Sequence, residues 1–201
     1  MISETTRSGC TAFNGARRIA SGDLVHVARK VKEALLRDEQ APILIFDDVT
    51  SEPVEIDFRG DIEAVVRRLA VRSGGEPPPA DPGTAHRGPG RPRLGVVARE
   101  VTLLPRHWEW LVSQPGGASV ALRKLVEEAR RTSAGADRMR LARETSYRFM
   151  VAIAGDRPGF EEAARALFAG DRERYDRLLA VWPADIRDHA RKLAVPAWTA
   201  E

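Results

Sequence analysis

The hydrophobic and polar positions of residues 10–73 follow helical and strand spacing in turn. Short apolar runs over 11–14, 18–20 and 42–47 predict strands. Apolar residues three and four apart over 24–35 predict a helix that ends near residue 37, with Ser21 or Asp23 as its cap. Val54, Ile56 and Phe58 alternate with charged residues and predict a further strand, and a second helix follows Gly60-Asp61. These elements predict a small ββαββα unit.

The next part of the chain changes from a breaker-rich stretch to a new pattern. Residues 74–92 are rich in proline and glycine, which neither a helix nor a sheet ladder tolerates, so this stretch is predicted to be a linker. Beyond it, residues 96–104 predict a strand and Pro105–Ser113 a short helix. After Gln114-Pro-Gly-Gly, a helix is predicted from Ser119 to Arg131.

The last third reads as helical throughout. Helices are predicted over 137–154 and 160–169, then from Asp171 and from Pro183. Trp108 and Trp182 fall at apolar helix positions, where burial is expected, whereas Trp110 lies on another side of its helix and is the better interface candidate. The chain is therefore predicted to hold four segments: 10–73, 74–92, 93–132 and 136–195.

The strand predicted at 96–104 lacks a neighbour, because two short helices follow it. A lone strand cannot satisfy its own backbone hydrogen bonds, so it must join the N-terminal sheet or pair with the same strand of a second copy. Val101-Thr-Leu-Leu-Pro105, Arg106-His-Trp-Glu-Trp-Leu111 and Gly117-Ala-Ser-Val-Ala-Leu-Arg-Lys-Leu-Val126 resemble the ribbon-helix-helix repressors of the Arc and MetJ type. The predicted fold class is α+β: the N-terminal unit, the linker, a ribbon-helix-helix-like strand-helix-helix and a C-terminal helical region.

This resemblance implies a homodimer that binds DNA. In that family the paired strands enter the major groove, and the N-terminus of the second helix holds a phosphate. Gly90-Arg-Pro-Arg93 is similar to the core of an AT-hook, whose arginines enter the minor groove. The residues expected to contact DNA are Arg91, Arg93, Arg99, Thr102, Ala118, Ser119, Arg123 and Lys124. The residues expected in the dimer core are Val101, Leu103, Leu122, Leu125 and Val126.

The ribbon departs from the family in its reading face. If Val101 and Leu103 face the core, the groove receives Glu100 and Thr102; in the opposite register Arg99 is free, but both apolar side chains meet DNA. Neither register gives a basic reading face. We therefore expect DNA binding that is at best weakly sequence-specific.

The distribution of charge agrees with a polyanion site in the middle of the chain. Residues 86–143 hold 12 Lys/Arg and 5 Asp/Glu, whereas the N-terminal 85 residues and the last 58 are both slightly acidic, although the net charge is only +3. A basic surplus of this kind attracts phosphates.

The residues that carry chemistry elsewhere do not form a recognisable catalytic or metal motif. Asp47 and Asp48 fit a turn, and the carboxylates within residues 52–57 fit the solvent-exposed face of a strand. The four histidines lie in separate segments. Cys10 is the only cysteine, which indicates a cytoplasmic protein without disulfides. No apolar run is long enough for a membrane helix, and the N-terminus lacks an apolar export signal. We expect no enzyme activity, no metal and no cofactor.

Five further strings carry a resemblance over nearly the whole chain: Leu44-Ile-Phe-Asp-Asp48, Gly90 to Trp108, Tyr147-Arg-Phe-Met150, Gly159-Phe-Glu-Glu-Ala163 and Trp182-Pro-Ala-Asp-Ile-Arg187. Through them the chain resembles a bacterial family known as domain of unknown function 2239. The resemblance implies a bacterial cytoplasmic protein and supplies no activity.

Two functions follow as expectations. The first is a homodimeric DNA-binding regulator or nucleoid-associated factor, which acts through residues 93–132. The alternative is a dimeric adaptor that binds a protein partner and no DNA, which a large exposed apolar patch on the C-terminal helices would favour.

Overall fold

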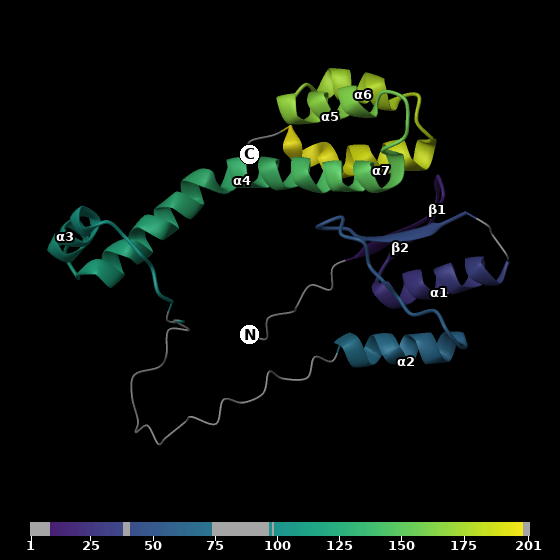
Figure 1. Cartoon of the computed structure of the whole chain (residues 1–201), viewed down its shortest axis with the longest axis horizontal. Coiled ribbons are helices and arrows are strands. Elements are labelled where there is room, and N and C mark those ends of the chain that lie inside the picture. Colours follow the sequence, from purple (N-terminus) through teal and green to yellow (C-terminus); the bar gives the residue numbers. More distant parts are fainter. Residues whose placement is uncertain (1–8, 38–40, 74–96, 98, 199–201) are drawn as a thin grey trace. The chain divides into compact units, whose positions relative to one another are not determined.

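The computed structural model describes residues 9–37, 41–73, 97 and 99–198. In these ranges the chain forms one three-stranded antiparallel sheet and seven α-helices, so the fold is mixed α+β and mostly helical (Figure 1). The strands are β1 (Cys10–Asn14), β2 (Arg17–Gly22) and β3 (Ile43–Asp47). The helices are α1 (Leu24–Leu36), α2 (Ile62–Ser73), α3 (Pro105–Ser113), α4 (Ala118–Ala154), α5 (Phe160–Ala169), α6 (Arg172–Leu179) and α7 (Ala184–Ala194), followed by the 3-10 turn η1 (Val195–Ala197).

The chain divides into two compact units. The first unit comprises residues 1–74 and 134–201, and the second comprises residues 75–133. Helix α4 begins in the second unit and ends in the first. The linker predicted over 74–92 lies outside the described residues.

The sheet of the first unit has the order β2-β1-β3, with β1 in the centre and fully buried. Ala12 pairs with Ala20 on one side and with Ile45 on the other, both antiparallel. The three strands confirm the predictions for 11–14, 18–20 and 42–47. The helices that follow β2 and residue 61 are also confirmed, each with the predicted aspartate accepting backbone N–H groups: Asp23 from Val25 and His26, and Asp61 from Ala64.

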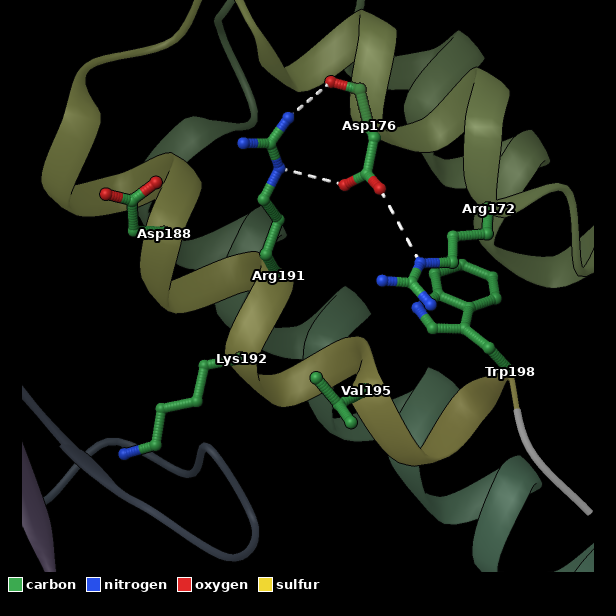
Figure 2. A pocket seen from close by; sticks show the side chains of 7 residues that line it. All are labelled: Arg172, Asp176, Asp188, Arg191, Lys192, Val195 and Trp198. Atoms are coloured by element: carbon green, nitrogen blue, oxygen red, sulfur yellow. Dashed lines mark hydrogen bonds and ion pairs between the residues drawn. The ribbon is translucent and has the colours of Figure 1, made fainter.

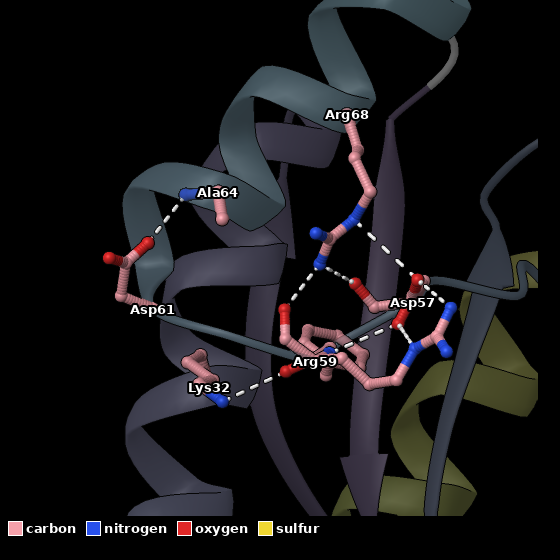
Figure 3. Close-up of polar contacts among 7 residues, drawn as sticks. Lys32, Asp57, Arg59, Asp61, Ala64 and Arg68 are labelled. Carbon is pink, nitrogen blue, oxygen red and sulfur yellow. Dashed lines mark hydrogen bonds and ion pairs between the residues drawn. The ribbon is translucent and has the colours of Figure 1, made fainter.

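The strand predicted over 54–59 is wrong. Pairing with β3 stops after an isolated bridge between Phe46 and Pro53. Its two hydrogen bonds run from Asp47 N–H to the Glu52 carbonyl and from Val54 N–H to the Ile45 carbonyl. The reason is that the backbone carbonyls of the next residues accept hydrogen bonds from side chains of α1 and α2 (Figure 3). Lys32 donates to the Phe58 carbonyl at 2.9 Å, and Arg68 donates to the carbonyls of Asp57 and Arg59. The predicted ββαββα arrangement therefore lacks its fourth strand.

The burial pattern of the same segment is as predicted. Val54, Ile56 and Phe58 are half-buried, while the residues between them are exposed. Their side chains pack against the cores that the sheet forms with α1 and that α1 forms with α2. Alternation alone thus identified the correct buried face in a segment that is not part of the sheet.

The C-terminal helices share the main core of the first unit with the sheet. Phe13 of β1 and Phe46 of β3 lie 5.4 and 5.2 Å from the ring of Phe149 on α4. Polar contacts join the same parts: the Thr145 hydroxyl donates to the Val49 carbonyl, and the Arg18 N–H donates to Asp185. Residues 10–73 and 136–195 were predicted to be separate segments, whereas in the structure they pack as one unit.

Helix α4 is one helix of 37 residues, where two helices were predicted. The stretch expected to separate them, 132–136, contains no proline. Its single Gly135 costs about 1 kcal/mol relative to alanine, which neighbouring helical turns easily offset. Thr132 donates its hydroxyl back to the Glu128 carbonyl, a bond that a continuous helix accommodates.

No helix in the described part of the chain combines the length and the apolar character needed to cross a membrane.

Candidate dimerisation and nucleic-acid interface

The second unit is a helical hairpin formed by α3, a tight turn and the first part of α4. Helix α3 spans Pro105–Ser113, as predicted, with Pro105 in its first turn. In the turn, Gly117 N–H donates to the Gln114 carbonyl at 2.9 Å. Gly116 and Gly117 have φ values of 86° and 75°, a left-handed conformation that residues with a Cβ rarely adopt. Two adjacent glycines thus let α4 start directly after α3.

The strand predicted at 96–104 is not formed in the single chain. Residues 97 and 99–104 have no regular secondary structure, and the described sheet contains only β1, β2 and β3. The option in which this segment joins the N-terminal sheet is therefore wrong for the described residues. A ribbon formed between two copies stays a prediction, since one chain alone offers it no partner.

The residues predicted for the dimer core are largely on the surface of the single chain. Val101, Leu125 and Val126 are 54, 48 and 56% exposed, and Leu103 and Leu122 are half-buried. Within the described part of this unit, only Leu111 and Ala121 are buried.

The tryptophans add to this exposed apolar surface. Trp108, expected to be buried, is 38% exposed, and Trp110 is 50% exposed. Trp182 in the first unit is buried, as expected, and donates its indole N–H to the Pro158 carbonyl.

The residues predicted to contact DNA divide into three groups. Arg91 and Arg93 of the AT-hook-like string lie outside the described residues. Arg99 and Thr102 are exposed in the segment before α3. Ala118, Ser119, Arg123 and Lys124 come together in the first two turns of α4, where Ala118 is half-buried and the other three are exposed.

The spacing of the charges on α4 was not predicted from the sequence. Ser119, Arg123 and Arg130 are four and seven residues apart, which puts them on one side of the helix. Lys124 and Glu128 are four apart on another side, and Leu122, Leu125 and Ala129 lie between. The signal was present in the sequence, because all these positions fall within the helix predicted from Ser119 to Arg131.

Among the described residues, no group of histidine, cysteine or acidic side chains could hold a metal ion. Asp47 accepts the N–H groups of Val49 and Thr50, as a turn residue does. Asp57 is held by Arg59 at 2.8 Å, and hydrogen bonds from this arginine lower the pKa of the carboxyl well below its usual range. Cys10 is buried, and burial raises the pKa of its thiol to about 11, so it stays protonated.

The fold and this site define a mixed α+β protein with an exposed, basic helical hairpin. The chain belongs to the family DUF2239, described as an uncharacterized protein conserved in bacteria, whose model matches residues 9–194. No curated protein and no solved structure matches the chain.

Proposed function

We propose that this protein is a homodimeric DNA-binding regulator or nucleoid-associated factor, whose second unit pairs with that of another copy. The observation that carries the proposal is the exposed apolar surface of α3 and of the first turns of α4.

A hairpin with so little burial is poorly stabilised on its own. Each fully buried leucine or valine contributes about 1.5–3 kcal/mol, and in the described part of this unit only one large aliphatic side chain, Leu111, is buried. Leu122, Leu125 and Ala129 recur at helical spacing, which forms a stripe suited to a second helix. A partner that covers this stripe supplies the missing burial.

The charges beside the stripe favour a second copy as that partner. When two α4 helices cross in opposite directions around Val126, Lys124 of one copy lies opposite Glu128 of the other, and the reverse pair forms by symmetry. A two-fold interface needs this kind of self-complementarity. The same arrangement brings Leu125 of both copies near the centre and places Leu122 of each copy beside Ala129 of the other.

The other side of α4 supports nucleic-acid binding. Ser119, Arg123 and Arg130 follow the N-terminus of α4, where backbone N–H groups and the helix dipole attract phosphate. Two copies would present two such sets. Because neither register of the predicted ribbon gives a basic reading face, contacts to phosphates rather than to bases would provide most of the affinity.

Fluorescence anisotropy with a labelled duplex, titrated with salt, tests the DNA proposal. We expect binding that weakens steeply with salt and depends little on sequence. Arg123→Gln should lower the salt slope by about one, because it removes one positive charge that neutralises a phosphate. Arg165→Gln is the matched control, an exposed arginine on α5 with its own ion pair to Glu162. Absence of binding to any duplex at about 50 mM salt would refute DNA binding.

A second candidate function is a dimeric adaptor for a protein partner. It is favoured by an exposed aromatic cluster on α4 and α5, in which Tyr147 lies 6.2 Å from Phe160 and 5.4 Å from Phe168 between ring centroids. Tyr147 and Phe168 are both exposed. A protein that dimerises through α4 but binds no DNA in the anisotropy experiment would support this candidate.

A further inference from the structure

A cleft of about 390 Å³ opens in the first unit between α6, α7 and the turn η1. Figure 2 shows the seven side chains that line it: Arg172, Asp176, Asp188, Arg191, Lys192, Val195 and Trp198. Its size falls in the range of small-molecule sites, and neither the predicted dimer nor the predicted DNA contacts use it.

The cleft has more positive than negative charge. Asp176 is shared by two arginines: its carboxylate lies 2.8 Å from Arg191 Nε and 3.7 Å from Arg172 Nε. Asp188 is neutralised by Arg187, 2.7 Å away and outside the cleft lining. Lys192 has no ion pair with any described residue. One carboxylate therefore balances only one of two arginines. Lys192 is a further positive charge on the rim, but Figure 2 shows its side chain pointing away from Arg172 and Trp198.

The apolar part of the cleft is a fixed aromatic ring. Trp198 is half-buried, and its ring packs against Tyr175 at 5.4 Å between centroids. Val195, exposed beside it, continues the apolar wall. Arg191 is fixed as well, because it also donates to the Asp176 carbonyl at 2.7 Å. A ring next to surplus cations suits a ligand with a flat aromatic part and a negative group.

We propose that this cleft binds a small aromatic anion, with the ligand's ring against Trp198 and its negative group held by Arg172, whose guanidinium lies beside that ring in Figure 2. A nucleoside monophosphate and an aromatic carboxylate share this chemistry. The site would give the protein a small-molecule effector, and it does not depend on DNA binding.

Isothermal titration calorimetry of the full chain, without DNA, tests this site. The probes are adenosine monophosphate, benzoate, adenosine and inorganic phosphate. If the monophosphate binds, and adenosine and inorganic phosphate bind more weakly or not at all, the proposal is supported with a phosphate as the negative group. If benzoate binds, and adenosine and inorganic phosphate bind more weakly or not at all, it is supported with a carboxylate as the negative group. Equal binding of adenosine and its monophosphate, or no binding of either anion at millimolar concentration, would overturn it.

Variants locate the binding. Arg172→Gln should weaken the anion at least about tenfold, as the loss of a charge-assisted hydrogen bond does. Lys192→Gln should weaken it less, because the Lys192 side chain points away from Arg172 (Figure 2). Arg177→Gln is the control, since this arginine lies on the same helix, makes an ion pair of the same i,i+4 kind with Glu173, and does not line the cleft. Trp198→Leu should weaken the aromatic anions and leave any phosphate binding unchanged. Anion binding that none of the cleft variants alters would also refute the site, provided that circular dichroism shows them folded.

Discussion

At the residue scale, His189 has the most unusual environment. It is 2% exposed, its ring centroid lies 4.6 Å from Phe149 and 5.3 Å from Phe13, and neither ring nitrogen has a hydrogen-bond partner among the described residues. Burial lowers its pKa to about 4, helped by Lys192 and Arg18 and opposed by Asp48. His189 is therefore neutral in the folded protein at neutral pH.

This environment predicts a specific loss of stability in acid. The unfolded chain binds a proton at His189 near pH 6.5, whereas the folded chain does so near pH 4. The stabilisation is complete above pH 6.5 and is lost as the pH falls toward 4, on the order of 3 kcal/mol in total. Denaturant unfolding at a series of pH values between 7 and 4 measures this dependence.

Substitution identifies the residue responsible. His189→Phe should flatten the dependence between pH 6.5 and 4, because it removes the titrating group and keeps an aromatic ring beside Phe149. His26→Gln is the control, since His26 is exposed and should leave the pH dependence unchanged. An unaltered slope in His189→Phe would show that other groups cause the acid sensitivity.

The hydroxyl of Tyr175 gives a second prediction at this scale. It lies 3.1 Å from the Ser146 hydroxyl and 3.4 Å from the Ala190 carbonyl, and burial raises its pKa to about 12. Tyr175→Phe should lower the free energy of unfolding by about 1 kcal/mol. Tyr147→Phe, at the exposed tyrosine, should change it much less. Equal effects of the two substitutions in denaturant unfolding would contradict the buried network.

At the scale of elements, the continuity of α4 is the largest departure from the predicted arrangement. If the helix runs through Gly135, Gly135→Pro should destabilise it by about 3 kcal/mol or more, and Gly135→Ala should stabilise it by up to about 1 kcal/mol. Thermal unfolding followed by circular dichroism measures both changes. A Gly135→Pro protein as stable as the parent would indicate a break between two helices.

The elements show what local pattern predicts and where it fails. Periodicity and capping residues located β1 to β3 and most helices, because Asp23, Asp61 and Asp171 each accept N–H groups where the sequence placed a cap. The prediction of a strand after Pro53 was wrong, because Lys32 and Arg68, which are distant in sequence, donate hydrogen bonds to the backbone carbonyls of this segment. Tertiary hydrogen bonds of this kind leave no periodic signal.

The candidate site was predictable to a similar extent. The stop at Gly116-Gly117 and the basic start of α4 followed from the sequence, which placed Ser119, Arg123 and Lys124 in the first turns of a helix. Their contact with DNA stays a prediction. The cleft at Trp198 was not, because its lining comes from α6, α7 and η1, which only the folded chain brings together.

At the scale of the whole molecule, the shared core makes the first unit depend on both ends of the chain. Phe149→Ala on α4 removes a ring that packs against Phe13 and Phe46, and should cost about 3–5 kcal/mol. Hydrogen exchange should show β1 and β3 losing protection together with α4. A loss of protection in α4 alone would mean that the sheet is stable without the C-terminal helices.

Dimerisation through α4 is the central claim, and sedimentation equilibrium tests it most directly. We expect a species of twice the 22.2 kDa chain mass, which Leu125→Glu converts to monomer because it places a charge in the apolar stripe. Val181→Glu, at a valine of the first unit that is 76% exposed, should leave the dimer intact. A parent protein that sediments at 22.2 kDa at micromolar and higher concentrations would contradict dimerisation.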